Sequence, residues 1–130
     1  MSVQTMSVRG IRGATTVCED QAEAILSATR ELMLAICEAN PTLRPADIAS
    51  IFFTVTDDLS AVYPALAARS ISPEWAEVPL MCAREIPVPG SLRCAIRVML
   101  LWNTALTQKE IHHVYLREAV ALRPDLAREH

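Results

Sequence analysis

Apolar and polar residues alternate with two different periods along this chain, and these periods predict strands and helices. Apolar and β-branched residues are concentrated in residues 8–17, 50–56, 77–83 and 94–102, which predicts four strands. Between residues 20 and 41 the apolar residues recur at helical spacing instead, which predicts one long helix. The positions that carry this spacing are Ile25, Leu26, Thr29, Leu32, Met33, Ile36 and Cys37.

Local signals predict where the helices begin and end. Asp20 is expected to cap the long helix, with the acidic Glu23 at its third position. A short helix is expected over residues 61–69, with Pro64 in its first turn. Residues 107–110 form a capping-box sequence, Thr-Gln-Lys-Glu, which predicts a last helix running to about residue 122, before Arg123-Pro124 stops it. The predicted order is β-α-β-α-β-β-α.

The composition is that of one folded domain. The chain has 130 residues, of which 52% are hydrophobic and 21% charged. A chain of this size buries about two-thirds of the surface that it exposes when unfolded. The high apolar fraction therefore hints that other subunits cover part of the apolar surface.

Several protein classes are disfavoured by the sequence. The longest unbroken apolar run, residues 98–102, is far shorter than the roughly 18–20 residues of a membrane span. The first residues lack the pattern of a secretory signal, so the cytoplasm is the expected location. A net charge of −3 does not favour nucleic acid as a partner. Free thiols without a structural zinc site are expected from the spacing of four cysteines: Cys18, Cys37, Cys82 and Cys94.

One arginine lies within the most apolar strand. Residues 94–102 are apolar at every position except Arg97, so this strand is expected to be buried on both faces. A guanidinium group buried without an anion costs several kcal/mol, so Arg97 needs a negatively charged partner. That partner is either Glu85 or Asp58 in a buried salt bridge, or a bound anionic ligand. The sequence leaves both interpretations open.

Arg9 and Arg12 are three positions apart in the first strand, which places them on opposite faces unless Gly10 causes a bulge. At most one of them is therefore expected to share a pocket with Arg97. Arg12 is the better candidate, because the small residues that follow it leave room for a ligand. Arg9 is expected to be a solvated residue at the edge of the sheet.

Other residues with reactive side chains give weaker signals. Glu85 lies where a strand leaves the sheet, a common place for binding residues, although a plain surface carboxylate is the alternative. Cys82 is expected to be a small buried hydrophobic residue. Two adjacent histidines, His112 and His113, are expected on a helix, where they cannot chelate one ion. Tyr115 is expected in the core or at an interface.

No glycine pattern that cradles a nucleotide phosphate occurs in the chain, so no nucleotide cofactor is indicated. The candidate site is thus a group of arginines without a metal, a nucleophile or a convincing general base. Such a site suits the binding of a small polyanion. It also suits a reaction that needs only conformational restraint and electrostatics.

Five segments together resemble the monofunctional chorismate mutases of the trimeric, mixed α/β type. The resemblance covers residues 8–126, which leaves an N-terminal extension (1–7), expected to be flexible, and a C-terminal tail (127–130). The segments are Arg9-Gly-Ile-Arg12-Gly-Ala-Thr-Thr16, Ala61-Val-Tyr-Pro-Ala65, residues 82–85, Cys94-Ala-Ile-Arg97-Val98 and residues 113–126.

The resemblance implies a fold and an activity. The fold is α+β, a mixed sheet with helices on one face, and three subunits form a pseudo-barrel with the active sites in the clefts between neighbours. The reaction is the Claisen rearrangement of chorismate to prephenate, on the route from the shikimate pathway to phenylalanine and tyrosine. The family uses neither a cofactor nor a metal.

The resemblance also implies roles for individual residues. Arg97 would lie beside the ether oxygen of the substrate and one carboxylate, and Arg12 with Tyr115 would hold the enolpyruvyl carboxylate. Glu85 would accept a hydrogen bond from the ring hydroxyl, with Cys82 close by. The remaining implied substrate-binding residues are Tyr63 from the adjacent subunit, Arg69 and Arg123 toward the mouth, and Leu80, Met81 and Leu122.

Two positions depart from the family pattern, and two other functions stay open. Leu66 stands where relatives can have Lys, and Met81 where a smaller polar residue can occur, which puts the rate of substrate capture in doubt. One alternative is a trimeric deaminase of imine and enamine intermediates, which resembles this fold. The other is a non-catalytic trimeric module that binds a carboxylate of the aromatic pathway.

Overall fold

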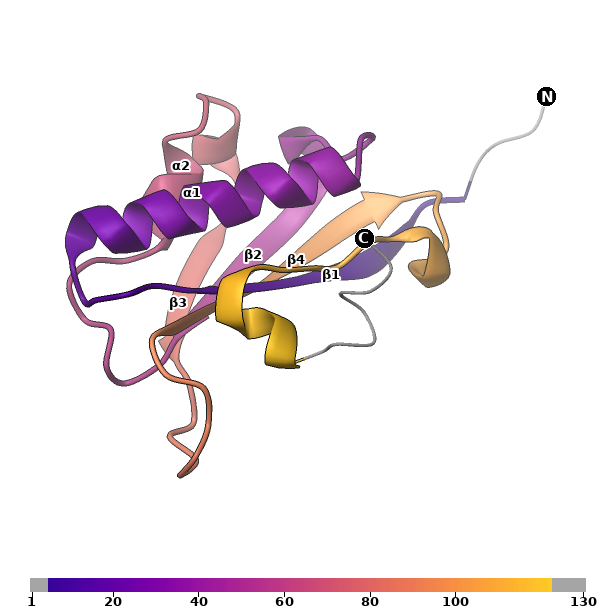
Figure 1. Cartoon of the computed structure of the whole chain (residues 1–130). Coiled ribbons are helices and arrows are strands. Elements are labelled where there is room, and N and C mark those ends of the chain that lie inside the picture. The colour runs from indigo at the N-terminus through magenta and orange to yellow at the C-terminus, as the bar shows by residue number, and fades with distance from the viewer. Residues whose placement is uncertain (1–4, 123–130) are drawn as a thin grey trace.

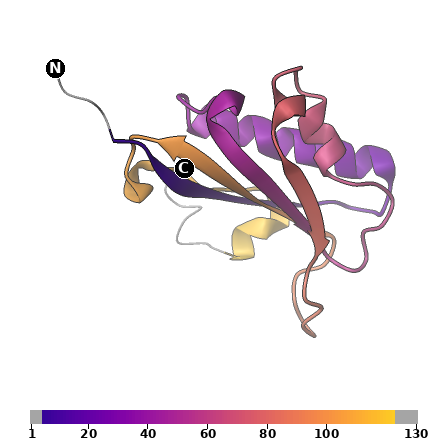
Figure 2. The ribbon, with the colours of Figure 1, turned by 180° about the vertical axis from the view of Figure 1, so that it is seen from behind.

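The computed structural model describes residues 5–122, which form a mixed five-stranded sheet with helices on one face (Figures 1 and 2). This arrangement confirms the α+β fold class. The strands are β1 (Ser7–Thr16), β2 (Ile48–Val55), β3 (Leu80–Arg84), β4 (Ala95–Thr104) and β5 (Val114–Tyr115). The predicted helix end at Arg123-Pro124, the tail 127–130 and residues 1–4 of the predicted extension lie outside the described residues.

Two α-helices lie on the same face of the sheet (Figure 1). The long one, α1 (Ala22–Ala39), fits the predicted helix, whereas α2 (Ala65–Arg69) is shorter than predicted and begins after Pro64. The other helical segments are single 3-10 turns or little more: Pro45–Asp47, Trp75–Glu77, Gln108–Glu110 and Arg117–Leu122. The last of these lies on the other side of the sheet from α1 (Figures 1 and 2).

The strand order in the sheet is β3-β2-β4-β1-β5. The centre is the antiparallel pair of β1 and β4, which runs in unbroken register from Ser7 opposite Thr104 to Thr16 opposite Ala95. β2 pairs antiparallel with the other edge of β4, while β3 and β5 join as parallel outer strands. Side chains alternate between the faces of a sheet, so this register decides which residues can share a site.

The core lies between the sheet and α1. Ile11, Leu100 and Phe53 are fully buried from the sheet side, and Leu32 and Ile36 from the helix side. The two layers approach closely at Gly13, where an added Cβ would lie 2.8 Å from Ile36 Cδ1 and 3.0 Å from Val98 Cγ1. The absence of a side chain at this position therefore allows α1 to pack against β1.

The other face of the sheet is open in the single chain. Along β4, Ile96, Val98 and Leu100 are buried, whereas Arg97 is exposed and Met99 is only partly buried. The expectation that residues 94–102 are buried on both faces is thus wrong for the isolated chain. The apolar residues on this second face would be buried only if another molecule covered them.

Asp20 does not cap α1, contrary to the prediction. The residue before the helix is Gln21, and no side chain caps the helix there. The Asp20 carboxylate instead accepts hydrogen bonds from the Ser60 amide (2.9 Å), the Ala61 amide (3.0 Å) and the Ser60 hydroxyl. These backbone hydrogen bonds hold the pKa of Asp20 below its usual value. Asp20 therefore fastens the segment that leads to α2.

The helix predicted over 107–122 is also wrong. The capping box is present, because the Thr107 amide and hydroxyl both contact Glu110 Oε1, but it opens only the turn Gln108–Glu110. The chain then extends and pairs Val114–Tyr115 with β1 as the short parallel strand β5. Pairing with an open sheet edge has overridden the local helix signal in this segment.

We predict that Gly13→Ala destabilises the fold by about 1–3 kcal/mol, since its Cβ would overpack the contact between β1 and α1. Thermal unfolding should show a clear fall in Tm. Gly10→Ala is the matched control, because its Cβ would meet only the end of the Met99 side chain, at 3.3 Å. Equal melting temperatures for the two variants would contradict this account of Gly13.

We also predict that Asp20→Asn weakens the acid dependence of stability. The folded-state pKa of Asp20 is lowered, so its contribution is present above about pH 4 and is lost as the pH falls through the folded-state value. Urea unfolding between pH 7 and pH 3 should show a less stable variant at pH 7 and a smaller difference from wild type at pH 3. Glu19→Gln is the control, and a constant difference at all pH values would refute the prediction.

Candidate active site

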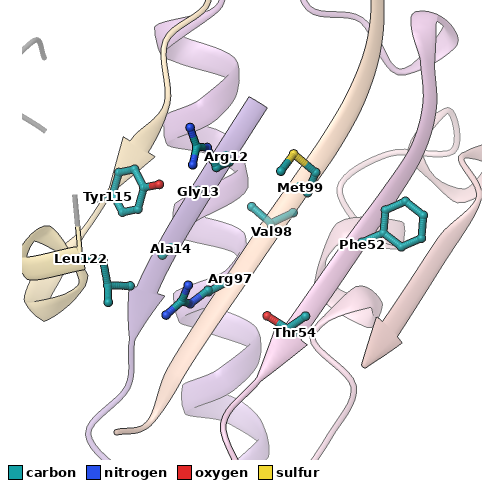
Figure 3. Close-up of a pocket in the computed structure, with 10 residues that line it drawn as sticks. All are labelled: Arg12, Gly13, Ala14, Phe52, Thr54, Arg97, Val98, Met99, Tyr115 and Leu122. Carbon is teal, nitrogen blue, oxygen red and sulfur yellow. The ribbon is translucent and has the colours of Figure 1, made fainter. Parts of the chain in front are cut away.

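A pocket of about 400 Å³ lies on the open face of the sheet (Figure 3). Its floor comes from the three central strands, and β5 and the Arg117–Leu122 turn form one side. Two guanidinium groups and the hydroxyl-bearing Thr54 and Tyr115 give the pocket its polar part, and the rest of its lining is apolar. The lining residues are Arg12, Gly13, Ala14, Phe52, Thr54, Arg97, Val98, Met99, Tyr115 and Leu122.

The register of β1 and β4 brings Arg12 and Arg97 to the same face. Arg97 lies opposite Ala14, and Arg12 lies opposite Met99. Since positions 12, 14, 97 and 99 share a face, both guanidinium groups point into the pocket (Figure 3). The small side chain of Ala14 leaves the space between them open. The expectation that Arg12 rather than Arg9 joins Arg97 is confirmed.

Arg9 belongs to the other face, opposite the buried Trp102. Its Nε donates to the carbonyl of Leu106 at 3.1 Å, and the residue is partly buried. Arg9 is thus a structural donor that ties β1 to the segment after β4, not the solvated edge residue that the sequence predicted.

Arg97 has an anionic partner within the chain and still faces open space. Its Nε lies 3.3 Å from Glu85 Oε2, and 47% of its side chain is exposed against 22% for Glu85. The hydroxyl of Thr54 donates to the same Oε2 atom. Of the two partners that the sequence left open, Glu85 is the one used, while Asp58 binds the amide of Cys94 instead.

Tyr115 reaches the pocket through β5. The parallel pairing of Ala14 with Tyr115 places the ring beside the arginines (Figure 3). His113 supports the same junction, because its Nδ1 accepts the amide hydrogen of Arg12 at 2.9 Å. The residue-based expectation was that Tyr115 lies in the core or at an interface, on a helix; the helix is wrong here, and the ring lines the pocket instead of the core.

A second pocket, of about 520 Å³, collects other predicted site residues beside α2. Tyr63, whose side chain is 74% exposed, and Cys82 both line it. Cys82 pairs with Phe53 and so faces the helix side of the sheet, away from Arg97. Within one chain the predicted residues therefore fall into two separate groups.

The remaining predicted residues lie around these two groups. Met81 is 62% exposed and pairs with Phe52, whereas Leu80 is partly buried at the start of β3. Arg69 ends α2 and is exposed. Leu122 lines the first pocket, and Arg123 lies outside the described residues. The departure at Leu66 is an exposed position on α2.

Other chemistry is poorly represented in residues 5–122. This part of the chain contains neither a group of metal-ligating side chains nor a helix able to cross a membrane. All four cysteines are free. Burial raises the pKa of the Cys37 and Cys94 thiols, which disfavours the reactive thiolate at either position.

Thr54 is a polar pocket residue that the sequence did not single out. It lies in a strand that was predicted correctly, and it shares a face with Phe52 because the two are two positions apart. Most residues of this strand are apolar, so the polar Thr54 on its open face does not stand out. Period-two alternation from Phe52 to Thr56 was the signal that could have found it.

The geometry defines a small α+β domain with a pocket on the open face of its sheet, into which two guanidinium groups point. The comparisons with known proteins agree with one another. The family chorismate mutase type I matches residues 8–126. The chain is 58% identical over 119 residues to chorismate mutase AroH of Thermus thermophilus, covering 92% of this chain and 96% of that protein.

Two further relatives extend the comparison. The chorismate mutase AroH of Bacillus subtilis is 47% identical over 122 residues, with 94% of each chain covered. A solved chorismate mutase from Clostridium thermocellum matches with a TM-score of 0.81 and 48% identity, over 86% of this chain and 97% of that one. The chain therefore belongs to the chorismate mutase type I family and is an isomerase.

Proposed function

We propose that the pocket on the open face binds chorismate and that Arg97, Arg12 and Glu85 promote its rearrangement to prephenate. The observation that carries this proposal is the convergence of two guanidinium groups on one pocket, one of them paired with a carboxylate. The family membership supplies the reaction, and the geometry supplies the residues.

The charges of the pocket suit the substrate. Chorismate carries two carboxylates, and a guanidinium group binds a carboxylate through two parallel hydrogen bonds. Arg12 and Tyr115 enter the pocket side by side from β1 and β5, and we assign them to the enolpyruvyl carboxylate. Holding both ends of the substrate favours its compact diaxial form, which brings the reacting carbons together.

Arg97 is assigned to the transition state. In the rearrangement a carbon–oxygen bond breaks while a carbon–carbon bond forms within one molecule, so no group is transferred and no cofactor is needed. Negative charge grows on the ether oxygen as its bond to carbon breaks. A cation held beside that oxygen stabilises the transition state more than the bound substrate, which is how binding energy becomes rate.

Glu85 is assigned to the ring hydroxyl. A carboxylate accepts a hydrogen bond from a hydroxyl group, and Glu85 forms an ion pair with Arg97, which lines the pocket. A negative group beside the arginines also disfavours anions that lack this hydroxyl. The pair would then select chorismate over simpler dicarboxylates.

The second pocket supports assembly into a trimer. Tyr63 and Cys82 line a cavity separate from the arginines, so one chain alone does not bring them to the substrate. The open face also exposes apolar side chains, among them Val8, Phe52 and Met81. We assign this face to contacts between subunits, with Tyr63, Cys82 and Arg69 of one chain completing the pocket of its neighbour. Leu80 and Met81 follow Cys82 into that wall, and Leu122 and Arg123 adjoin it from the other chain.

We place the protein in the cytoplasm, where its product would supply the synthesis of phenylalanine and tyrosine. Residues 8–126 would form the whole catalytic domain, since the family match has the same limits. Ser7 belongs to this domain rather than to a flexible extension, because it pairs with Thr104 at the start of β1.

Arg97→Ala should lower kcat about 100- to 1,000-fold, the range found when one donor to a developing oxyanion is removed. Arg97→Lys should remain poor because a lysine lacks the planar fork. Arg30→Ala, an exposed arginine of α1 on the other side of the sheet, is the matched control. Near-normal kcat in Arg97→Ala would refute the electrostatic role.

The assay follows the loss of chorismate absorbance with purified protein in buffer free of added metal and cofactor. Prephenate must be identified as the product. A well-folded protein that binds chorismate without converting it would support the non-catalytic module. Release of ammonia from imine or enamine substrates would support the deaminase.

Sedimentation should give an assembly of three times the 14.3 kDa chain mass at working concentrations. Val8→Glu, a change on the exposed open face, should weaken this assembly because it places a charge at an apolar contact. Leu34→Glu, on the exposed side of α1, is the control. A wild-type protein that is active as a monomer would contradict the shared-site arrangement.

A further inference from the structure

We infer that Thr54 is a positioning residue for the rearrangement, acting through Glu85 rather than on the substrate. This inference rests on the proposed function. It comes from three side chains, from three strands or their ends, that contact one another where Thr54 and Arg97 line the pocket. Thr54 belongs to β2, Arg97 to β4, and Glu85 directly follows β3. Figure 3 shows Thr54 and Arg97 next to each other on the same face.

Thr54 and Arg97 both contact the same oxygen of Glu85, one through a hydrogen bond and the other through an ion pair. The Thr54 hydroxyl donates to Oε2, and Arg97 Nε lies 3.3 Å from Oε2. Within residues 5–122, Glu85 Oε1 receives no hydrogen bond. The hydrogen bond from Thr54 and the ion pair with Arg97, both on one oxygen, restrict the rotation of the carboxylate and leave the other oxygen to accept the hydroxyl of a ligand.

The backbone around Thr54 makes this arrangement rigid. Thr54 lies directly opposite Arg97 in the antiparallel pairing of β2 with β4. On the other side, the Glu85 amide donates to the carbonyl of Val55 at 2.8 Å, so Glu85 is fastened to the residue after Thr54. The hydroxyl therefore bridges two fixed points, and its β-branched side chain has few alternative rotamers.

The same contact orients Arg97. Because the contact with Oε2 is made through Nε, the two terminal nitrogens of the guanidinium group have no partner within residues 5–122. Those nitrogens are the donors available to the ether oxygen and a carboxylate. A Glu85 side chain free to rotate would release Nε and let the fork turn. The effect should therefore fall on kcat, where the charge on the ether oxygen counts, more than on KM.

The test compares Thr54→Val with Thr54→Ser in the intact assembly. Valine keeps the shape and removes the donor, whereas serine keeps the donor. Thr54→Val should lower kcat roughly 10- to 150-fold, the range for losing a hydrogen bond to a charged group, with KM changed less than threefold. Thr54→Ser should restore kcat to within about threefold of wild type.

A double-mutant comparison shows whether Thr54 acts through Glu85. In a Glu85→Gln background, Thr54→Val should cause a much smaller further loss of kcat than it does alone, because the side chain that it positions is already altered. Thr104→Val is the structural control: Thr104 is a buried threonine at the far end of β4 whose Oγ1 accepts the Leu106 amide. It should lower Tm while leaving kcat unchanged.

Each result has a distinct meaning. Wild-type kcat in Thr54→Val, with Glu85→Gln impaired, would overturn the role of Thr54 and leave the proposed function standing. Wild-type kcat in Glu85→Gln would instead overturn the assignment of Glu85. Fully independent losses in the double variant would show that Thr54 does not act through Glu85. If Thr54→Val fails to assemble, Thr54→Ala against Thr54→Ser gives the same comparison.

Discussion

The whole arrangement depends on the ten-residue antiparallel pairing of β1 with β4. This register places Ile11, Gly13, Val98 and Leu100 against α1, and it sends Arg12 and Arg97 to the opposite face. Core and site are therefore the two sides of one ladder of hydrogen bonds. The other strands add to this ladder: β2 brings Thr54 beside Arg97, and β5 brings Tyr115 beside Ala14.

Much of the fold and part of the site could be predicted from the spacing of apolar residues and from the alternation of side chains between the two faces of a strand. Four strands and the long helix were recognisable because their apolar spacing is strong, and alternation alone separated Arg12 from Arg9. The errors have a common cause, which is that local signals competed with partners distant in sequence. Asp20 is a residue type that favours an N-cap, but its carboxylate accepts hydrogen bonds from the amides of Ser60 and Ala61 instead. The segment after Thr107 has the signal of a helix start, but it pairs with the open edge of the sheet as β5.

The two faces of the sheet explain why sequence and isolated chain disagree about burial. The apolar face under α1 is satisfied within the chain, whereas Val8, Phe52 and Met81 on the other face remain exposed. A strand such as β4 is apolar on both sides because each side has a different partner. The sequence shows that both faces of such a strand are apolar, but it does not show whether a helix or another subunit covers each face.

The close approach at Gly13 has a consequence for how this sequence can vary. A single residue inserted into or deleted from β1 would exchange the faces of every later position in the strand. Arg12 would then turn toward α1, and a side chain from the open face would meet Ile36. One such length change would therefore disrupt both the core and the pocket that holds the two arginines. Variation in chain length is therefore confined to the connections, and the strand itself can change only by substitution.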